Sequence, residues 1–190
     1  MGRQKVQVLV GRHHAIEREP PRRLQLAIGM PANERMDWLV EKATELGVVA
    51  IQPLMTRRSV VRLDDERARK KTAHWTSIAI AACEQCGRNR VPTIHTVASL
   101  PAWIQSPGIG PAGAGARVLL SLRTGAPSLR QVVPECDLHD GVVTVLSGPE
   151  GGLTEAEEAL AIAQGFEPTS LGPRVFRSET AALVALTLLA

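Results

Sequence analysis

Two glycine-rich segments near the carboxyl end hold the residue types best suited to bind a ligand and to do chemistry. They are residues 147–154, SGPEGGLT, and residues 171–180, LGPRVFRSET. Each follows a predicted strand, and ligands of open α/β sheets usually bind at the carboxyl ends of the strands. Neither segment has the lysine and hydroxyl ending of a P-loop or the G-x-G-x-x-G spacing of a dinucleotide site. A nucleoside triphosphate or a dinucleotide is therefore a poor candidate ligand.

The structural alternative is that both segments are simply turns followed by a helix cap. A single glycine-rich turn is more often structural than functional. Here two such turns lie about 20 residues apart, and each leads into a helix and carries a carboxylate or an arginine. This combination favours a binding site over two unrelated turns.

Strands and helices are predicted to alternate along most of the chain. Apolar runs predict strands at residues 6–10, 24–28, 48–54, 91–97, 118–122, 142–147 and 168–171. Apolar residues at helical spacing predict helices at residues 34–46, 65–86, 100–104, 129–133 and 155–164, and from residue 178 onward. Thr154 and Glu157 have the spacing of a capping box, and Gly47 and Gly87 mark helix ends. The alternation predicts an α/β fold whose parallel sheet is covered on both faces.

Charge is distributed unevenly along the 190 residues. Residues 1–95 contain 17 Lys and Arg against 10 Asp and Glu, whereas residues 96–190 contain 5 against 9. The first half is therefore the expected surface for a polyanion such as RNA. Hydrophobic residues make up 44% and charged residues 22%, which excludes a mainly disordered or fibrous protein. With only 3% aromatic residues, Trp38, Trp75 and Trp103 are interpreted as packing residues and not as a platform for stacked bases.

The cysteines and the hydropathy pattern favour a cytoplasmic protein. Three cysteines cannot form a closed set of disulfides, which indicates a reducing compartment. Residues 181–190 are the most apolar stretch, and they are far fewer than the roughly 20 residues that a membrane-spanning helix needs. The pair Cys83 and Cys86 has no second pair and no adjacent histidine, so core packing is preferred over a zinc or redox site. No metal is expected.

Five motifs, in order along the chain, resemble one enzyme family. They are residues 36–47 (MDWLVEKATELG), 57–59 (RRS), 84–88 (EQCGR), 148–152 (GPEGG) and 171–181 (LGPRVFRSETA). Together they resemble the RsmE-type methyltransferases of the SPOUT superfamily. The resemblance implies a homodimer that uses S-adenosyl-L-methionine to methylate N3 of a uridine in the 16S rRNA of the small ribosomal subunit. The alternatives are a SPOUT methyltransferase for another RNA nucleotide and a non-catalytic RNA-binding module.

The same resemblance implies a division into domains. Residues 31–190 would be the SPOUT domain, with a trefoil knot in its carboxyl-terminal part. Family members carry a whole PUA-like β-barrel before this domain. Residues 1–30 are too few to build such a barrel, so we expect only a part of it there.

The resemblance also implies site residues, since in the family three loops close round the cofactor. Here these loops map to the end of the strand at residues 119–121, the loop at 148–152 and the loop at 171–176. The expected cofactor-binding residues are Leu120, Ser121, Gly148, Glu150, Gly151, Gly152, Leu171, Gly172, Arg174, Val175 and Phe176. The expected catalytic residues are Arg177, Glu179 and Glu150, because methylation at N3 requires loss of a proton and creates an anion that an arginine stabilises. The structural alternatives are helix stabilisation by Glu179 and a salt bridge from Arg177 to it. The expected RNA-binding residues are Arg35, Lys42, Arg57, Arg58, Arg88 and Arg90.

Three further expectations concern assembly and mutation. Residues 181–190 are apolar except for Thr187, so the last helix needs cover on every side, which a subunit interface would supply. A valine at Gly148 is expected to fill space that the adenosine needs. An alanine at Arg58 is expected to weaken RNA binding and leave cofactor binding unchanged.

Overall fold

A seven-stranded sheet, all of whose paired strands are parallel, forms the centre of the molecule. The computed structural model describes residues 7–32, 34–106, 115–133 and 141–190. The strands are β1 (Arg23–Gly29), β2 (Ala50–Met55), β3 (Thr93–Ile94), β4 (Ala98–Ser99), β5 (Arg117–Leu120), β6 (Val142–Ser147) and β7 (Glu167–Thr169). Their order is β3-β2-β1-β6-β5-β7, and β4 also pairs with β2. The predicted parallel α/β fold is confirmed.

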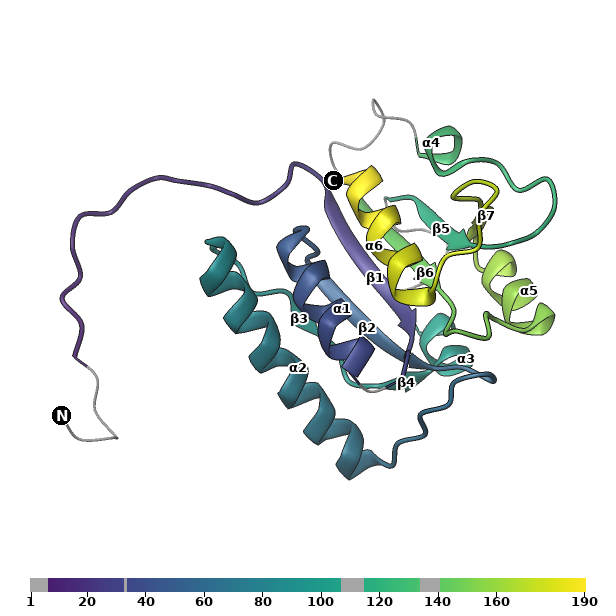
Figure 1. Cartoon of the computed structure of the whole chain (residues 1–190), viewed down its shortest axis with the longest axis horizontal. Helices are drawn as coiled ribbons and strands as arrows, with labels where there is room; N and C mark the ends of the chain where they lie inside the picture. Colours follow the sequence, from purple (N-terminus) through teal and green to yellow (C-terminus); the bar gives the residue numbers. More distant parts are fainter. Residues whose placement is uncertain (1–6, 33, 107–114, 134–140) are drawn as a thin grey trace.

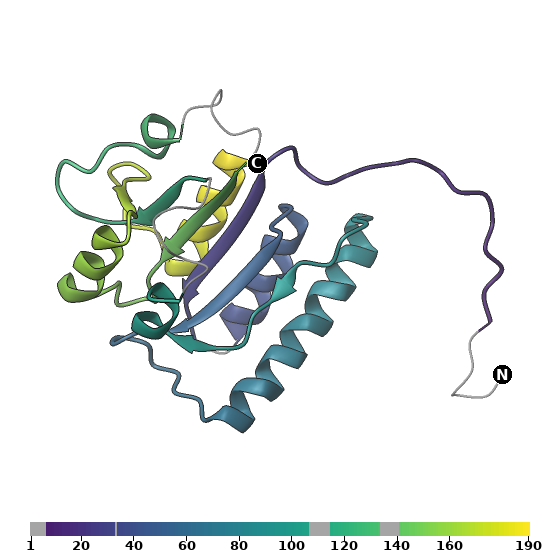
Figure 2. The same cartoon turned by 180° about the vertical axis from the view of Figure 1, so that it is seen from behind.

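Helices cover both faces of this sheet (Figures 1 and 2). They are α1 (Glu34–Glu45), α2 (Asp65–Cys86), α3 (Leu100–Ile104), α4 (Leu129–Val132), α5 (Glu155–Ala163) and α6 (Ser178–Leu189). On one face, Leu24, Leu26 and Ile28 of β1 pack in a core with apolar residues of α1, α2 and α6. On the other face, Ala27 belongs to a second core formed with α3 and α5. The alternation of side chains along β1 thus supplies both cores.

The helix ends follow from local capping groups. Asp64 caps α2 by accepting a hydrogen bond from the backbone N–H of Arg67, and Gly87 ends the helix with a φ of 74°. That left-handed conformation favours glycine, and it lets the Gly87 N–H donate to the carbonyl of Cys83. The bounds of α2 are therefore those that the sequence predicts. The capping box of Thr154 and Glu157 at the start of α5 is confirmed as well.

Two expectations for the first thirty residues are wrong. Residues 7–10, the described part of the first predicted strand, are exposed and form no strand. The second predicted strand exists as β1, but it lies in the centre of the main sheet and pairs with β2 and β6. Both hydrogen-bonding edges of β1 are thus occupied, so no edge is left for residues 7–10. The strand therefore belongs to the main sheet and not to a separate β domain.

The strand predicted at residues 91–97 is interrupted. Only Thr93 and Ile94 form β3, and pairing with β2 resumes at Ala98. The gap lies opposite the middle of β2, where Pro53 has no N–H to donate to a neighbouring strand. The side-chain amide of Gln52 instead donates to the carbonyl of Thr96 at 2.9 Å, which joins the two segments across the gap.

One side of α6 is buried against other elements of the same chain. Ala182, Ala185, Leu186 and Leu189 of α6 are buried, and α6 packs against β1, β6 and α1. The opposite side stays accessible, with Leu188 40% exposed. Within the described residues, no helix combines the length and the apolar character needed to cross a membrane.

Candidate functional site

A cavity of about 320 Å³ lies at the carboxyl ends of β5, β6 and β7. Three loops that follow these strands form most of its wall, and Arg58 and Glu158 complete it. All eleven residues predicted to bind a cofactor line this cavity: Leu120, Ser121, Gly148, Glu150, Gly151, Gly152, Leu171, Gly172, Arg174, Val175 and Phe176. The two glycine-rich segments thus meet in space, as the position of parallel strand ends predicts.

The loop after β6 is folded tightly on itself. The Gly152 N–H donates to the carbonyl of Pro149 at 2.8 Å and closes a turn. Gly148 faces this turn so closely that a Cβ there would lie 2.7 Å from the backbone nitrogen of Leu153. The close approach explains the glycine at 148 sterically and corrects our expectation that a side chain there would project into adenosine space. Pro149 in turn packs against Gly29 at the end of β1.

The basic loop after β2 holds the glycine-rich loop in place. The Arg58 guanidinium donates to the backbone carbonyls of Gly151 at 2.8 Å and Leu153 at 3.2 Å. The Arg57 N–H donates to the carboxylate of Glu157 at 2.7 Å, so the capping residue of α5 also anchors this loop. Arg58 therefore supports the cavity wall, which argues against the expectation that its replacement by alanine leaves cofactor binding unchanged. Sequence spacing gave no signal for this contact.

A carboxylate that the sequence analysis did not single out enters the cavity from α5. Glu158 accepts hydrogen bonds from the hydroxyl of Ser121 at 3.2 and 3.3 Å, and Arg123 lies 4.0 Å away. Apolar side chains of Leu120, Leu171 and Val175 line other parts of the wall. The cavity thus combines an acidic group, apolar surface and the backbone groups of glycine-rich turns. Such a lining suits a ligand with an ammonium group, an apolar portion and a flat heterocycle.

The predicted catalytic carboxylates are joined through Arg35. The Glu150 carboxylate accepts from the Ala32 N–H at 3.0 Å and lies 3.6 Å from an Arg35 Nη atom. The Nε atom of Arg35 lies 3.8 Å from Glu179, whose carboxylate also accepts from the hydroxyl of Ser178. Arg35 therefore links the loop after β6 to the start of α6. The sequence predicted Arg35 to be an RNA-binding residue and gave no indication of this bridge.

Arg177 precedes α6, next to Glu179, but within the described residues it does not form the salt bridge that the structural alternative gave it. Its side chain is exposed and lines a second, open hollow together with Glu179 and Arg35. The salt bridge weighed for Glu179 is made by Arg35, and the described part of the chain contains none between Arg177 and Glu179. Trp38, interpreted as a packing residue, also lines this hollow and is 45% exposed. That interpretation is wrong, whereas Trp75 and Trp103 are buried as predicted.

Comparison with known proteins gives the family. The model of a family described as an RNA methyltransferase domain matches residues 18–190. The chain belongs to this RNA methyltransferase family. The ribosomal RNA small subunit methyltransferase E of Bacillus subtilis is 35% identical over 201 residues, which is 98% of this chain and 73% of that protein. The enzyme of the same name from Synechocystis is 33% identical, and the match covers 90% of this chain and 54% of that protein.

A solved methyltransferase has the same arrangement of elements. The crystal structure of ribosomal RNA small subunit methyltransferase E from Neisseria gonorrhoeae, bound to S-adenosyl methionine, matches with a TM-score of 0.79 and 34% identity. The match covers 93% of this chain and 68% of that one.

Three of the predicted RNA-binding residues of this methyltransferase chain present basic side chains to solvent. Arg57 and Arg58 are exposed, and the Arg90 guanidinium is exposed and lies 3.3 Å from Glu17. Lys42 lies between Glu41 and Glu45, at 2.7 and 2.8 Å. Hydrogen bonds to these two carboxylates raise the pKa of Lys42 to about 12, and their charges offset its own.

Arg88 is not an RNA-binding residue in this structure. Its side chain is 3% exposed and forms an ion pair with Glu19. It also donates to the backbone carbonyls of Thr44 at 2.7 Å and Val48 at 3.1 Å. Arg88 thus joins the segment before β1 to the end of α1 and the start of β2. A buried arginine with this many partners is structural, so the prediction is wrong.

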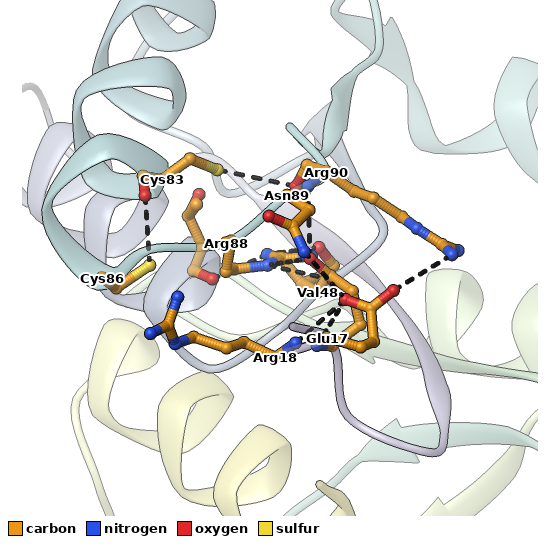
Figure 3. Close-up of polar contacts among 10 residues, drawn as sticks. Glu17, Arg18, Val48, Cys83, Cys86, Arg88, Asn89 and Arg90 are labelled. Atoms are coloured by element: carbon orange, nitrogen blue, oxygen red, sulfur yellow. Dashed lines mark hydrogen bonds and ion pairs between the residues drawn. The ribbon is translucent and has the colours of Figure 1, made fainter. Parts of the chain in front are cut away.

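Cys83 and Cys86, the two cysteines that the structure describes, fit core packing better than a zinc or redox site. Cys83 is buried, and burial raises the pKa of its thiol above the ordinary value. Its sulfur contacts the carbonyl of Arg90 at 3.6 Å, while that of Cys86 contacts the carbonyl of Cys83 (Figure 3). In the ranges that the structure describes, no group of three or more His, Cys, Asp or Glu is placed to hold a metal.

Proposed function

We propose that this chain is an S-adenosylmethionine-dependent methyltransferase that acts on N3 of a uridine in the 16S rRNA of the small ribosomal subunit. The observation that carries the proposal is the convergence of three strand-end loops on one cavity, lined by all eleven residues of the cofactor motifs. The family match over residues 18–190 and the Neisseria relative with bound S-adenosyl methionine support the same function.

The residues of the cavity fit S-adenosylmethionine. Gly151 and Gly152 lack side chains that would narrow the cavity. The backbone N–H and C=O groups of the turn can form hydrogen bonds with the edge of an adenine. Leu171, Val175 and Phe176 offer apolar surface to the ring, and the Glu158 carboxylate offers a partner to an ammonium group. When bound, the cofactor supplies an electrophilic methyl group, because its sulfonium sulfur keeps the electron pair of the broken bond.

The protein must then remove a proton from N3 and stabilise the anion that results. Glu179 is the proposed general base, since it is buried, lies beside the cavity through Ser178, and borders the open hollow as well. Arg177 and Arg35 are proposed to stabilise the negative charge on the base. Glu150 holds Arg35 from the other side and is proposed to position it. Arg57 and Arg58 are proposed to contact phosphates at the rim.

We propose further that the domain is of the SPOUT type, with a trefoil knot made by the loops after β5 and β6 and the segment before α6. The path supports this, because β7 lies at one edge of the sheet while α6 returns across β6 and β1 (Figure 1). Residues 7–22, the described segment before β1, are proposed to be a remnant of a PUA-like β domain. A second copy of the chain is proposed to cover the accessible side of α6, and the site of action is the cytoplasm.

The test is methylation of small ribosomal subunits that lack the modification. Purified protein and labelled S-adenosylmethionine should transfer label to 16S rRNA, and mass mapping should place the methyl group on N3 of one uridine. Label on another nucleotide would favour the alternative SPOUT activity. Calorimetry gives the second readout: a folded chain that binds no cofactor and transfers no label would favour a non-catalytic RNA-binding module.

A further inference from the structure

A second hollow beside the cofactor cavity has the shape and chemistry of a binding site for a single base. It has a volume of about 380 Å³ and is open to solvent. Its six lining residues come from α1 and the start of α6: Glu34, Arg35, Trp38, Arg177, Glu179 and Thr180. Five of the six are polar or charged, which is unusual for the core of a protein–protein contact and ordinary for a polar ligand.

The hollow and the cofactor cavity share a wall. Ser178 lines the cavity, and its hydroxyl donates to the carboxylate of Glu179, which lines the hollow. Glu150 lines the cavity and pairs with Arg35, which lines the hollow. A ligand in the hollow would therefore lie next to the cofactor, separated from it only by the residues proposed to do chemistry.

Trp38 gives the hollow a flat apolar surface. It is the one tryptophan of the three in the chain that is exposed, since Trp75 and Trp103 are 3% and 6% exposed. An indole ring that remains accessible beside arginines and a carboxylate is well placed to stack on an unpaired base. Stacking on an aromatic side chain is the usual way in which proteins hold a base that has left its stack.

The charged groups match the edge of uracil. Uracil presents one N–H donor, at N3, between two carbonyl acceptors. The hollow offers two carboxylates, the exposed Glu34 and the buried Glu179, together with two guanidinium donors, Arg35 and Arg177. Of the two carboxylates, Glu179 is the one that forms an ion pair with Arg35, so it is the acceptor we assign to the N3 proton. N3 of cytosine carries no proton, and an amino group stands where uracil has one of its carbonyls. The Glu179 carboxylate would then face another acceptor and one guanidinium would face another donor, so cytosine should bind more weakly than uracil.

We propose that this hollow binds the target uracil, stacked on Trp38 and read by Arg35, Glu179 and Arg177. The proposal rests on the proposed function and deepens it by assigning the site of the base. The N3 proton passes to the Glu179 carboxylate, and the two guanidinium groups stabilise the charge left on the carbonyl oxygens. Arg35 is a positioning residue as well, because it holds Glu150 and Glu179 in one ion-pair network.

The first test measures binding without cofactor and without turnover. Short oligomers of uridine and of cytidine are titrated into the protein, and quenching of tryptophan fluorescence is followed. The uridine oligomer should quench at lower concentration than the cytidine oligomer. The Trp38→Phe variant should lose most of the quenching and still bind labelled oligouridine. Equal quenching by the two oligomers, or full quenching in Trp38→Phe, would overturn the proposal.

The second test separates this proposal from the proposed function. Trp38→Ala should lower kcat/KM for ribosomal subunits by roughly 5- to 150-fold, since one lost stacking contact has about that effect. Its affinity for S-adenosylmethionine should not change, and Trp38→Phe should recover most of the activity. Ile80→Ala, which removes an exposed apolar side chain of α2, is the matched control.

The outcomes are distinguishable. If the wild type methylates subunits and Trp38→Ala is as active, the base site is wrong and the function stands. If the wild type methylates no RNA but still discriminates uridine from cytidine oligomers, the function is wrong and the base site stands. If Trp38→Ala changes the oligomeric state and leaves oligouridine binding intact, Trp38 belongs to a protein interface and the proposal fails.

Discussion

Replacement of Gly148 by alanine tests whether the tight loop after β6 shapes the cofactor cavity. The added Cβ would lie 2.7 Å from the Leu153 nitrogen and 2.8 Å from the Gly152 carbonyl carbon. Both are backbone atoms of the same turn, so they cannot rotate away as a side chain would. The loop must open instead, and overpacking of this kind costs about 1–3 kcal/mol. If cofactor binding must restore the original loop, affinity for S-adenosylmethionine should fall roughly 5- to 150-fold.

Gly11 gives the control in the same experiment, and Gly152→Ala tests the cost of a left-handed backbone conformation at the cavity wall. Gly152→Ala meets no atom within 4 Å, but its φ of 68° imposes a backbone cost of about 1–2 kcal/mol. Gly11→Ala meets no atom and has no positive φ, so it should behave as the wild type. Calorimetry measures the affinity and circular dichroism checks folding. The steric reasoning is refuted if folded Gly148→Ala binds the cofactor within twofold of the wild type.

Three further predictions concern the arginines and cysteines. Arg88→Met should lower the free energy of unfolding by about 3–5 kcal/mol in a denaturant titration, because it leaves Glu19 unpaired and largely buried. Arg90→Met should change it by less than about 1 kcal/mol, since that pair is exposed, and equal values for the two variants would mean that Arg88 is not structural. Arg58→Ala should weaken cofactor binding in calorimetry as well as RNA binding, because it removes two hydrogen bonds to the cavity wall; an unchanged cofactor affinity would restore the purely RNA-binding interpretation. Because burial raises the pKa of Cys83, a smaller fraction of its thiol is ionised at pH 8 than in an ordinary cysteine. Iodoacetamide should therefore modify Cys86 faster than Cys83, as measured by peptide mass mapping, and the reverse order would contradict the burial argument.

Features that depend on near neighbours in sequence were predictable. The bounds of α2 were correct because Gly87 marks its end and the apolar spacing inside it is regular. The edge of the sheet at which the 320 Å³ cavity lies was also predictable, since parallel strands place their carboxyl ends at one edge whatever their order. Gly148 and Gly172 meet because β6, β5 and β7 are also neighbours in the sheet, and residue types alone did not predict that order.

Features that depend on partners far away in sequence were not predictable from residue types. Arg88 and Glu19 are each ordinary surface residues by type, and nothing local indicates that they meet in a buried ion pair. The same holds for Arg35, whose charge suggested phosphate but whose neighbours are Glu150 and Glu179. The apolar pattern of β1 identified a strand and could not say which strands pair with it.

The central place of β1 has a consequence for how the protein is made. As the chain leaves the ribosome, β1 can pair with β2 early, but its other edge waits for β6, at residues 142–147. An apolar strand with an unpaired edge is prone to join strands of other molecules. During synthesis this chain therefore passes through a stage in which the central strand of its future sheet has one unpaired edge.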